Sequence, residues 1–260
     1  MEVFNMRQIF KLALVISFVV LPVKALQEKV INGNVFRTGT YEDVIDDFKK
    51  RVGPREVITF IGYSGRGYER EDKMLKMAEK FLKTKDPKGT VVNIGVTPEG
   101  IGAIYPLAKE MGFETFGIVS TQASEYLDGV SNVDNPYLVE DKAWGGYIDA
   151  SKKELTPTSK AMVDVSNMMI AYGAGDVGLA ELEQGIANGV KVKAYLFDEN
   201  HQKSTAKALK SGKPAPKIFY LPAFKKFVIK LNSSLRKTDS IKKRRNSRNE
   251  LTRSKSVSGF

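Results

Sequence analysis

The chain has 260 residues, of which 42% are hydrophobic, so it is long enough for one globular α/β domain with extensions. It has no cysteine and a single histidine, His201, which excludes disulfides, thiolate chemistry and a histidine-rich metal site. Residues 225–260 hold twelve Lys and Arg against two acids, so they carry almost all of the net charge of +11. The rest of the chain is nearly neutral, and we predict neither a metal nor a bound cofactor.

Residues 1–25 have the parts of a secretory signal peptide. Arg7 and Lys11 give the positive start, residues 12–21 are an unbroken apolar run, and Val23 and Ala25 suit a cleavage site. The run is shorter than the roughly 20 residues that a membrane span needs. We expect a mature protein that begins near Leu26 and works outside the cytoplasm, either periplasmic or secreted. An uncleaved anchor or a buried N-terminal helix is the alternative.

Residues 26–55 are predicted to be an N-terminal extension with one helix. Residues 30–40 suit irregular chain or a short strand. A helix is expected over residues 41–52, because Thr40 can cap its start and its apolar side chains recur at helical spacing (Val44, Ile45, Phe48 and Val52).

The first unit of strand, glycine loop and helix begins at Glu56. Residues 56–61 are apolar and β-branched, as in a strand that is buried on both faces of a parallel sheet. The loop Gly62–Gly67 follows, and a helix is predicted over residues 68–83. Arg66 in this loop offers a charged fork that suits phosphate, and a solvated loop charge is the alternative.

A second unit of the same kind follows. It consists of a strand over residues 90–94, the loop Gly95–Gly102 and a helix over residues 101–111, and a further strand is predicted over residues 114–119.

Residues 120–150 are less regular and rich in Gly, Asp and Asn, which favours an insertion that covers a pocket. Trp144 or Tyr147 would then stack on a base or a sugar. The alternative, which we favour, is that these aromatic rings pack a small satellite core.

The third glycine loop lies within residues 167–190, after a helix predicted over residues 156–165 with Thr156 as its cap. An apolar strand from Met168 runs into Gly173, Gly175 and Gly178, with Asp176 between the last two. A helix is predicted from Glu181 to Ala187, and Gly189 can end it. A strand, a glycine turn and a helix start form a phosphate cradle, because backbone N–H groups and the helix dipole attract an anion. Packing alone is the alternative reason for these glycines.

The last strand is predicted over residues 191–197, and a loop with a short helix over residues 198–211. Residues 213–231 are predicted to be a linker and a basic amphipathic helix. The amphipathic pattern covers residues 223–236, so it continues into the segment that follows. We favour docking of this helix against the domain over attachment to an anionic membrane. Residues 232–260 are predicted to be a disordered basic tail that could contact a membrane or nucleic acid.

The order of these elements predicts an α/β fold, a Rossmann-like doubly wound parallel sheet with helices on both faces, over residues 56–212. In such sheets ligands bind at the carboxyl ends of the strands, where all three glycine loops would lie. We therefore predict that the loops hold a small nucleotide-type ligand.

Three pieces of sequence resemble the SLOG group of Rossmann-like proteins, and most closely its LONELY GUY (LOG) type, often labelled lysine decarboxylase-like. They are ITFIGYSGRGY, NIGVTPEGIGAIYPLAKEMGFETFGIVS and TSKAMVDVSNMMIAYGAGDVGLAELEQGIANGVKV, in the family's order over roughly 140 residues. The resemblance implies cleavage of the N-glycosidic bond between a base and ribose 5′-phosphate. Such proteins are often dimers, so a homodimer is expected.

In that family a glutamate and an arginine serve the sugar and the leaving base. Glu181, or Glu183 if the loop is longer, matches the glutamate, and Lys160 matches the family's lysine. The arginine position is Ser159, and a serine cannot supply a charged fork. Arg66 is the candidate to replace it.

The predicted catalytic residues are thus Glu181 and Arg66. The predicted phosphate- and nucleotide-binding residues are Gly62, Ser64, Gly65, Gly67, Gly95, Thr97, Gly100, Gly173, Gly175, Asp176, Gly178 and Lys160. Because of Ser159, we rank nucleotide binding with weak or no catalysis first and LOG-type phosphoribohydrolase activity second. An interaction protein that uses its basic tail on anionic surfaces ranks third.

Overall fold

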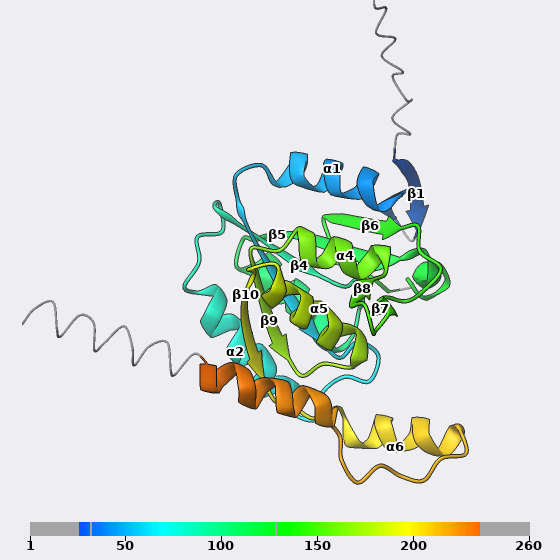
Figure 1. The fold of residues 1–260 in the computed structure, drawn as a ribbon. Helices are drawn as coiled ribbons and strands as arrows, with labels where there is room; N and C mark the ends of the chain where they lie inside the picture. The colour runs from blue at the N-terminus through cyan, green and yellow to red at the C-terminus, as the bar shows by residue number, and fades with distance from the viewer. Residues whose placement is uncertain (1–25, 32, 128, 235–260) are drawn as a thin grey trace, which may run out of the picture.

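A computed structural model describes residues 26–31, 33–127 and 129–234 of the chain. Its centre is an eight-stranded sheet in the order β1-β2-β6-β5-β4-β3-β9-β10, and only the pair β1 and β2 is antiparallel (Figure 1). The strands of this sheet are β1 (Gln27–Ile31), β2 (Asn34–Gly39), β3 (Glu56–Gly62), β4 (Thr90–Ile94), β5 (Glu114–Ser120), β6 (Asn135–Val139), β9 (Met168–Tyr172) and β10 (Lys191–Tyr195). A short separate hairpin pairs β7 (Tyr147–Asp149) with β8 (Glu154–Leu155).

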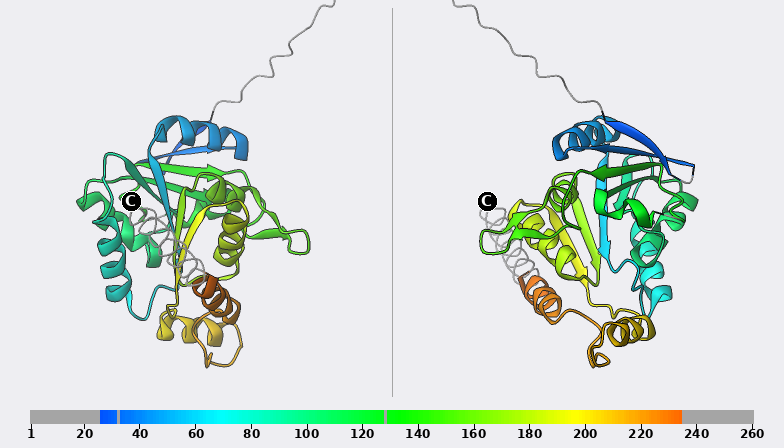
Figure 2. Two further views of the ribbon diagram at one scale, coloured as in Figure 1. Left: turned by 60° about the vertical axis from the view of Figure 1, so that its left-hand side comes forward. Right: turned by 90° about the vertical axis from the view of Figure 1, so that its right-hand side faces the viewer.

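Helices cover both faces of the sheet, as the views of Figure 2 show. The α-helices are α1 (Tyr41–Val52), α2 (Glu71–Leu82), α3 (Ile104–Glu110), α4 (Pro157–Asp164), α5 (Asp176–Ala187) and α6 (His201–Lys210), followed by a helix over residues 222–234. Two 3-10 turns are η1 (Gly100–Ala103) and η2 (Thr121–Tyr126).

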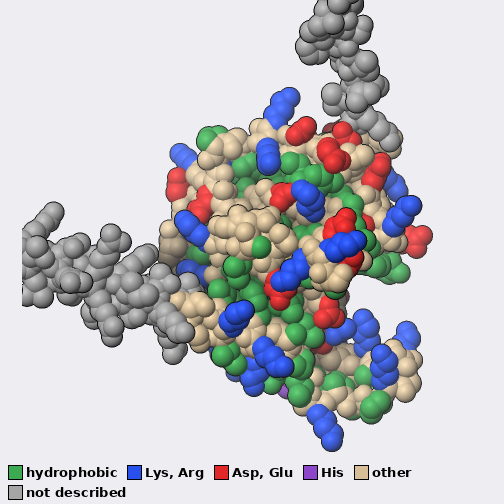
Figure 3. All heavy atoms as spheres, in the orientation of Figure 1, with side chains coloured by type: hydrophobic (Ala, Val, Ile, Leu, Met, Phe, Trp, Pro, Cys, Tyr) green, Lys and Arg blue, Asp and Glu red, His purple; other side chains and the backbone are tan. Residues whose placement is uncertain are grey.

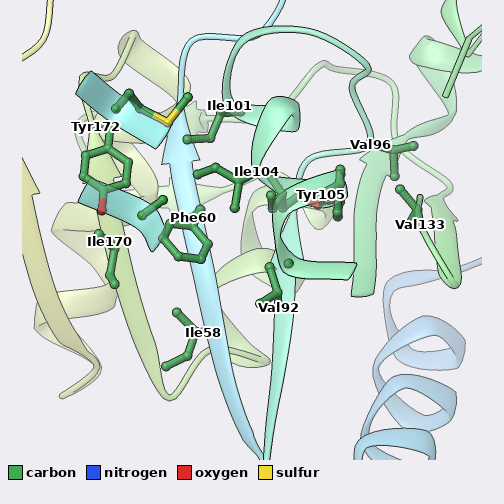
Figure 4. Close-up of a cluster of buried hydrophobic side chains, with 14 of the residues drawn as sticks. Ile58, Phe60, Val92, Val96, Ile101, Ile104, Tyr105, Val133, Ile170 and Tyr172 are labelled. Atoms are coloured by element: carbon green, nitrogen blue, oxygen red, sulfur yellow. Dashed lines mark hydrogen bonds between the residues drawn. The ribbon is translucent and has the colours of Figure 1, made fainter. Parts of the chain in front are cut away.

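Two apolar clusters form the core, one on each side of the sheet. The first joins one face of β3, β4 and β9 to α2 and α3, and the second joins the other face to α1, α4, α5 and the helix over residues 222–234. Figure 4 shows the first cluster, where Ile58 and Phe60 of β3 lie beside Ile170 and Tyr172 of β9. All five residues of β4, β6 and β9 are buried, as in parallel sheets with helices on both faces. The predicted fold class, a doubly wound α/β sheet, is confirmed.

Local sequence explains where several elements begin and end. Thr40 and Asp43 form a reciprocal capping box at the start of α1, and Thr156 accepts a hydrogen bond from the Ser159 N–H at the start of α4. At the end of α5, Gly189 has a φ of 82° and its N–H donates to Ile186, which closes the helix. These starts and stops agree with the prediction.

Two elements differ from the prediction. Residues 27–31 and 34–39 pair as two antiparallel strands, whereas residues 30–40 were predicted to be irregular chain or one short strand. Helix α5 begins at Asp176, five residues earlier than predicted, because Gly175 serves as its N-cap with an extended backbone. The third glycine loop is therefore shorter, and Gly178 lies in the first turn of the helix.

The interpretation of residues 120–150 as an irregular insertion is wrong for β6, which is a buried strand between β5 and β2. Its sequence begins with Asn135 and Pro136, and such a pair normally indicates a turn. In the fold the Asn135 amide group donates to Glu114 at 2.7 Å, and Tyr137 to Val139 are almost fully buried apolar residues.

The basic amphipathic helix docks against the domain, as we favoured. Phe224 and Val228 are buried in the second core cluster, while Lys225, Lys226 and Lys230 are exposed. Figure 3 shows Lys and Arg side chains over this helix and α6 as well as over the rest of the same face. Within the described residues, no helix is both long enough and apolar enough to cross a membrane. The predicted signal peptide (residues 1–25) and most of the predicted tail (residues 235–260) lie outside the described residues.

Candidate functional site

A cleft of about 1190 Å³ lies at the point where the order of the strands reverses. From β3 the chain proceeds to β4 and β5 on one side, whereas β9 and β10 lie on the other side. The loops that follow β3, β4 and β9 all line this cleft. Its position is the one at which doubly wound sheets bind their ligands.

Tyr63 lies in the first loop, and the other two loops pack against it. Its carbonyl oxygen accepts a hydrogen bond of 2.7 Å from the Ile101 N–H of the second loop. A Cβ at Gly100 would lie 2.2 Å from that oxygen, and a Cβ at Gly173 would lie 2.5 Å from the Tyr63 ring. Both glycines have a φ in the left-handed region, which other residues rarely adopt. Gly100 and Gly173 are therefore needed to bring the three loops together.

The Tyr63 side chain is itself fixed in the core. Its hydroxyl donates to the Phe197 carbonyl at 3.1 Å, and its backbone N–H donates to the Tyr68 hydroxyl at 3.1 Å. Burial raises the pKa of Tyr63, so the phenol remains a neutral donor at physiological pH. The same tyrosine thus anchors the loops to the segment that follows the last strand, β10.

A different set of glycines faces the open cleft. Gly65, Gly95 and Gly175 line it, and a Cβ added to any of them would meet no atom within 4 Å. Gly175 caps α5 without a side-chain hydrogen bond, so the N–H groups of the first turn, from Asp176 onward, have no partner within the helix and lie beside the cleft. Backbone amides at the start of a helix make a ready site for an anion such as phosphate.

The structure brings together most of the predicted site residues. The cleft is lined by Gly62, Ser64, Gly65, Arg66, Gly95, Thr97, Gly175, Asp176, Gly178 and Glu181. The carboxylate of Asp176 would repel a phosphate, so only its backbone amide suits the predicted role.

Four predicted binding residues lie elsewhere. Gly100 and Gly173 pack between the loops, and Gly67 closes the tight turn of the first loop, its N–H donating to Ser64 at 2.8 Å. Lys160 is the clearest correction, because α4 directs it to the outer surface, where its Nζ pairs with Asp164 and with the Tyr41 hydroxyl. The sequence match to the family's lysine therefore gave the wrong position in space.

Arg66 reaches the cleft but is already paired. Its Nη1 lies 2.6 Å from Oε1 of Glu199, and the other carboxylate oxygen of Glu199 accepts from the Ser204 hydroxyl at 2.8 Å. Glu199 is buried, so removing Arg66 would leave a buried charge unpaired. The pair links the first loop to the start of α6.

Glu181 lies in the wall of the cleft with only 5% of its surface exposed. Burial raises its pKa to about 7, and a hydrogen bond of 2.6 Å from the Ser159 hydroxyl acts in the opposite direction. A carboxyl group with this pKa is protonated in about half of the molecules near neutral pH and can act as an acid or a base. Glu183, the alternative match, pairs with Lys153 and does not line the cleft.

Ser159 also connects Glu181 to the loop that carries Trp144. The Gly146 N–H donates to the Ser159 hydroxyl at 2.7 Å, and a Cβ at Gly145 would lie 2.9 Å from the same oxygen. The hydroxyl is thus used both as a donor and as an acceptor.

The two aromatic residues considered in the sequence have different surroundings. Tyr147 is partly buried and packs against the second core cluster, as the satellite-core interpretation predicts. That interpretation is wrong for Trp144, which is exposed and lines the cleft beside Tyr126.

Sequence reasoning missed the basic side chains at the other end of the cleft. Lys207 of α6 and Lys213 just beyond it line the cleft, together with Pro216 and residues 218–222. They lie after the last strand, in a polar stretch that has no motif by which they could have been found. Within the part of the chain that the structure describes, no group of three or more His, Asp or Glu side chains is placed to hold a metal ion.

The fold and the cleft define a Rossmann-like α/β protein with an open site at its switch point. No protein-family model and no curated protein matches the sequence. Among solved structures, the chain is similar to the molybdenum cofactor carrier protein of Chlamydomonas reinhardtii, with a TM-score of 0.40 and 20% identity over 54% of this chain and 76% of that one. It is also similar to the molybdenum cofactor binding protein of the phototrophic bacterium Rippkaea orientalis, with a TM-score of 0.40 and 16% identity over 70% of this chain and 98% of that one.

The glycine contacts predict a difference between two substitutions. Gly100→Ala should lower the free energy of unfolding by at least about 1 kcal/mol, because it combines a left-handed backbone with a clash against the Tyr63 carbonyl. Gly65→Ala should change it by less than about 0.5 kcal/mol, because its methyl group points into open space. Urea unfolding of both variants measures this, and equal losses would contradict the division of the glycines into two sets.

The burial of Glu181 predicts a pH dependence of stability. Its pKa is about 7 in the folded chain and 4.5 in the unfolded chain, so folding takes up a proton between these values. Protonation of Glu181 makes its full contribution to the free energy of unfolding below about pH 4.5. This contribution is lost as the pH rises to about 7. Glu181→Gln removes this loss, so the variant should gain stability relative to the unsubstituted protein across that range, by up to about 1.4 kcal/mol per pH unit. Urea unfolding at several pH values tests it, and a constant difference between the two proteins would show that Glu181 does not titrate in this way.

Proposed function

We propose that the chain binds a phosphorylated nucleoside-type ligand in this cleft and is weakly catalytic or not catalytic. The observation that carries the proposal is the convergence of three glycine loops on one cleft, with Gly65, Gly95 and Gly175 open to it. The unpaired amides at the start of α5 suit the phosphate group. The sequence resemblance to the SLOG group supports the same class of ligand.

We propose weak or no catalysis because of the surroundings of Glu181. The side chain that contacts it is the neutral Ser159, at the position where the resembled family has an arginine. Arg66, the candidate replacement, is held by Glu199 instead. Without a positive charge beside the carboxyl group, the stabilisation of a charged transition state is weak.

The binding proposal is tested by calorimetry with nucleoside 5′-monophosphates. Gly175→Ala should weaken binding by about tenfold or more, because a methyl group would enter the space in front of the α5 amides, while its extended backbone accepts alanine. Lys160→Ala is the matched control and should bind like the unsubstituted protein, because this lysine lies outside the cleft. Absence of heat with every nucleotide in the panel would refute the proposal.

A second function, LOG-type phosphoribohydrolase activity, is favoured by the raised pKa of Glu181. Its protonated carboxyl group would give its proton to the leaving base as the N-glycosidic bond breaks and water adds to C1′. The expected result is release of free base from a nucleoside 5′-monophosphate, abolished by Glu181→Gln. Chromatography of the products measures it, and full activity of this variant would remove Glu181 from the catalytic role.

We also propose that residues 1–25 are cleaved on export, so that the protein acts outside the cytoplasm. N-terminal sequencing of the exported protein should start near Leu26, and an intact Met1 would contradict export by this route. A homodimer, and contact of the basic tail with anionic membrane or nucleic acid, remain predictions from the sequence.

A further inference from the structure

The cleft contains an aromatic pair that the phosphate-binding loops do not account for. The side chains of Trp144 and Tyr126 are 56% and 67% exposed, yet both line the cleft. Their ring centroids are 5.6 Å apart and the rings are tilted by 58°. Because a tilted pair is not stacked face to face, a face of the indole stays free for a third ring.

Single exposed aromatic residues are common and need no explanation. This pair differs because the loops that carry the two rings are tied to each other. The Ala143 N–H donates to the Asp141 carboxylate at 2.9 Å, and the side chains of Thr121 and Gln122 both donate to the Asp141 carbonyl at 3.1 Å. The two loops are therefore held together before any ligand arrives, which lowers the entropy cost of bringing both rings to one ligand.

The loop of Trp144 is also tied to the proposed phosphate site. Gly146 donates to Ser159, Ser159 donates to Glu181, and a Cβ at Gly145 would lie 2.9 Å from Val177 in the first turn of α5. The backbone that carries Trp144 thus lies beside the first turn of α5.

We infer that Trp144 and Tyr126 form the subsite for the base of the ligand, with the base stacked on the indole of Trp144. The inference rests on the proposed function, because it assumes that the phosphate lies at the glycine loops. It narrows the ligand class to nucleotides with a planar base but selects no particular base, since stacking does not read the edge of the base. It also gives Ser159 a role as a positioning residue that holds the base loop and Glu181 together.

The test uses the fact that Trp144 is the only tryptophan in the chain, so its fluorescence reports on this subsite alone. Adenosine 5′-monophosphate should quench the Trp144 emission as it binds. Ribose 5-phosphate should bind more weakly, as measured by calorimetry, and leave the emission unchanged. Trp144→Ala should weaken binding of adenosine 5′-monophosphate by about tenfold to a hundredfold and that of ribose 5-phosphate by less than about twofold.

Two further variants provide controls. Trp144→Phe should recover part of the lost affinity, because a phenyl ring still stacks. Ile148→Ala, which removes an exposed side chain just beyond the cleft on β7, should leave both affinities unchanged.

The outcomes separate the two proposals. Equal affinity for both ligands without quenching would overturn the base subsite and leave phosphate binding in place. No binding of either ligand would overturn the proposed function and the subsite with it. A blue shift of the Trp144 emission that grows with protein concentration in the absence of ligand would assign the pair to contact between copies of the chain and overturn the inference.

Discussion

The site depends on the packing of two glycine loops against Tyr63. The second loop approaches the Tyr63 carbonyl so closely that Gly100 leaves no room for a side chain, and the third loop approaches the ring in the same way at Gly173. Three loops from three separate strands are thereby brought to one cleft, although they are far apart in sequence. Because the Tyr63 hydroxyl is bound to Phe197, the assembled loops are fixed to the core as well.

The position of this cleft could be predicted from the sequence. Which of its residues face the cleft and which pack between the loops could not. The strands and glycine loops were predicted because apolar runs that end in glycine have a local signal. Which glycines face a ligand is decided by neighbours distant in sequence, and Gly65 and Gly100 look alike until their contacts are known. Lys160 was misplaced for a similar reason, since a match in spacing does not determine which side of α4 a residue occupies. Strand β6 was missed because its first residues resemble a turn, and only the pairing with β5 and β2 overrides that preference.

Ser159 joins the wall of the cleft to a neighbouring loop. It supplies one small hydroxyl group, which donates to Glu181 and accepts the N–H of Gly146. The close contact of Gly145 with the same oxygen indicates that a longer side chain at this position would displace the loop of Trp144.

The most direct test of this account is a nuclear magnetic resonance titration of protein labelled with nitrogen-15 only at glycine, with ribose 5-phosphate as the ligand. The account predicts that the amide signals of Gly65, Gly95 and Gly175 shift with a common saturation curve, because these residues face the cleft. Signals from remote glycines such as Gly53 and Gly189 should stay in place. Shifts confined to the remote glycines, or no shift at any concentration, would contradict the claim that the three loops hold a phosphate group together.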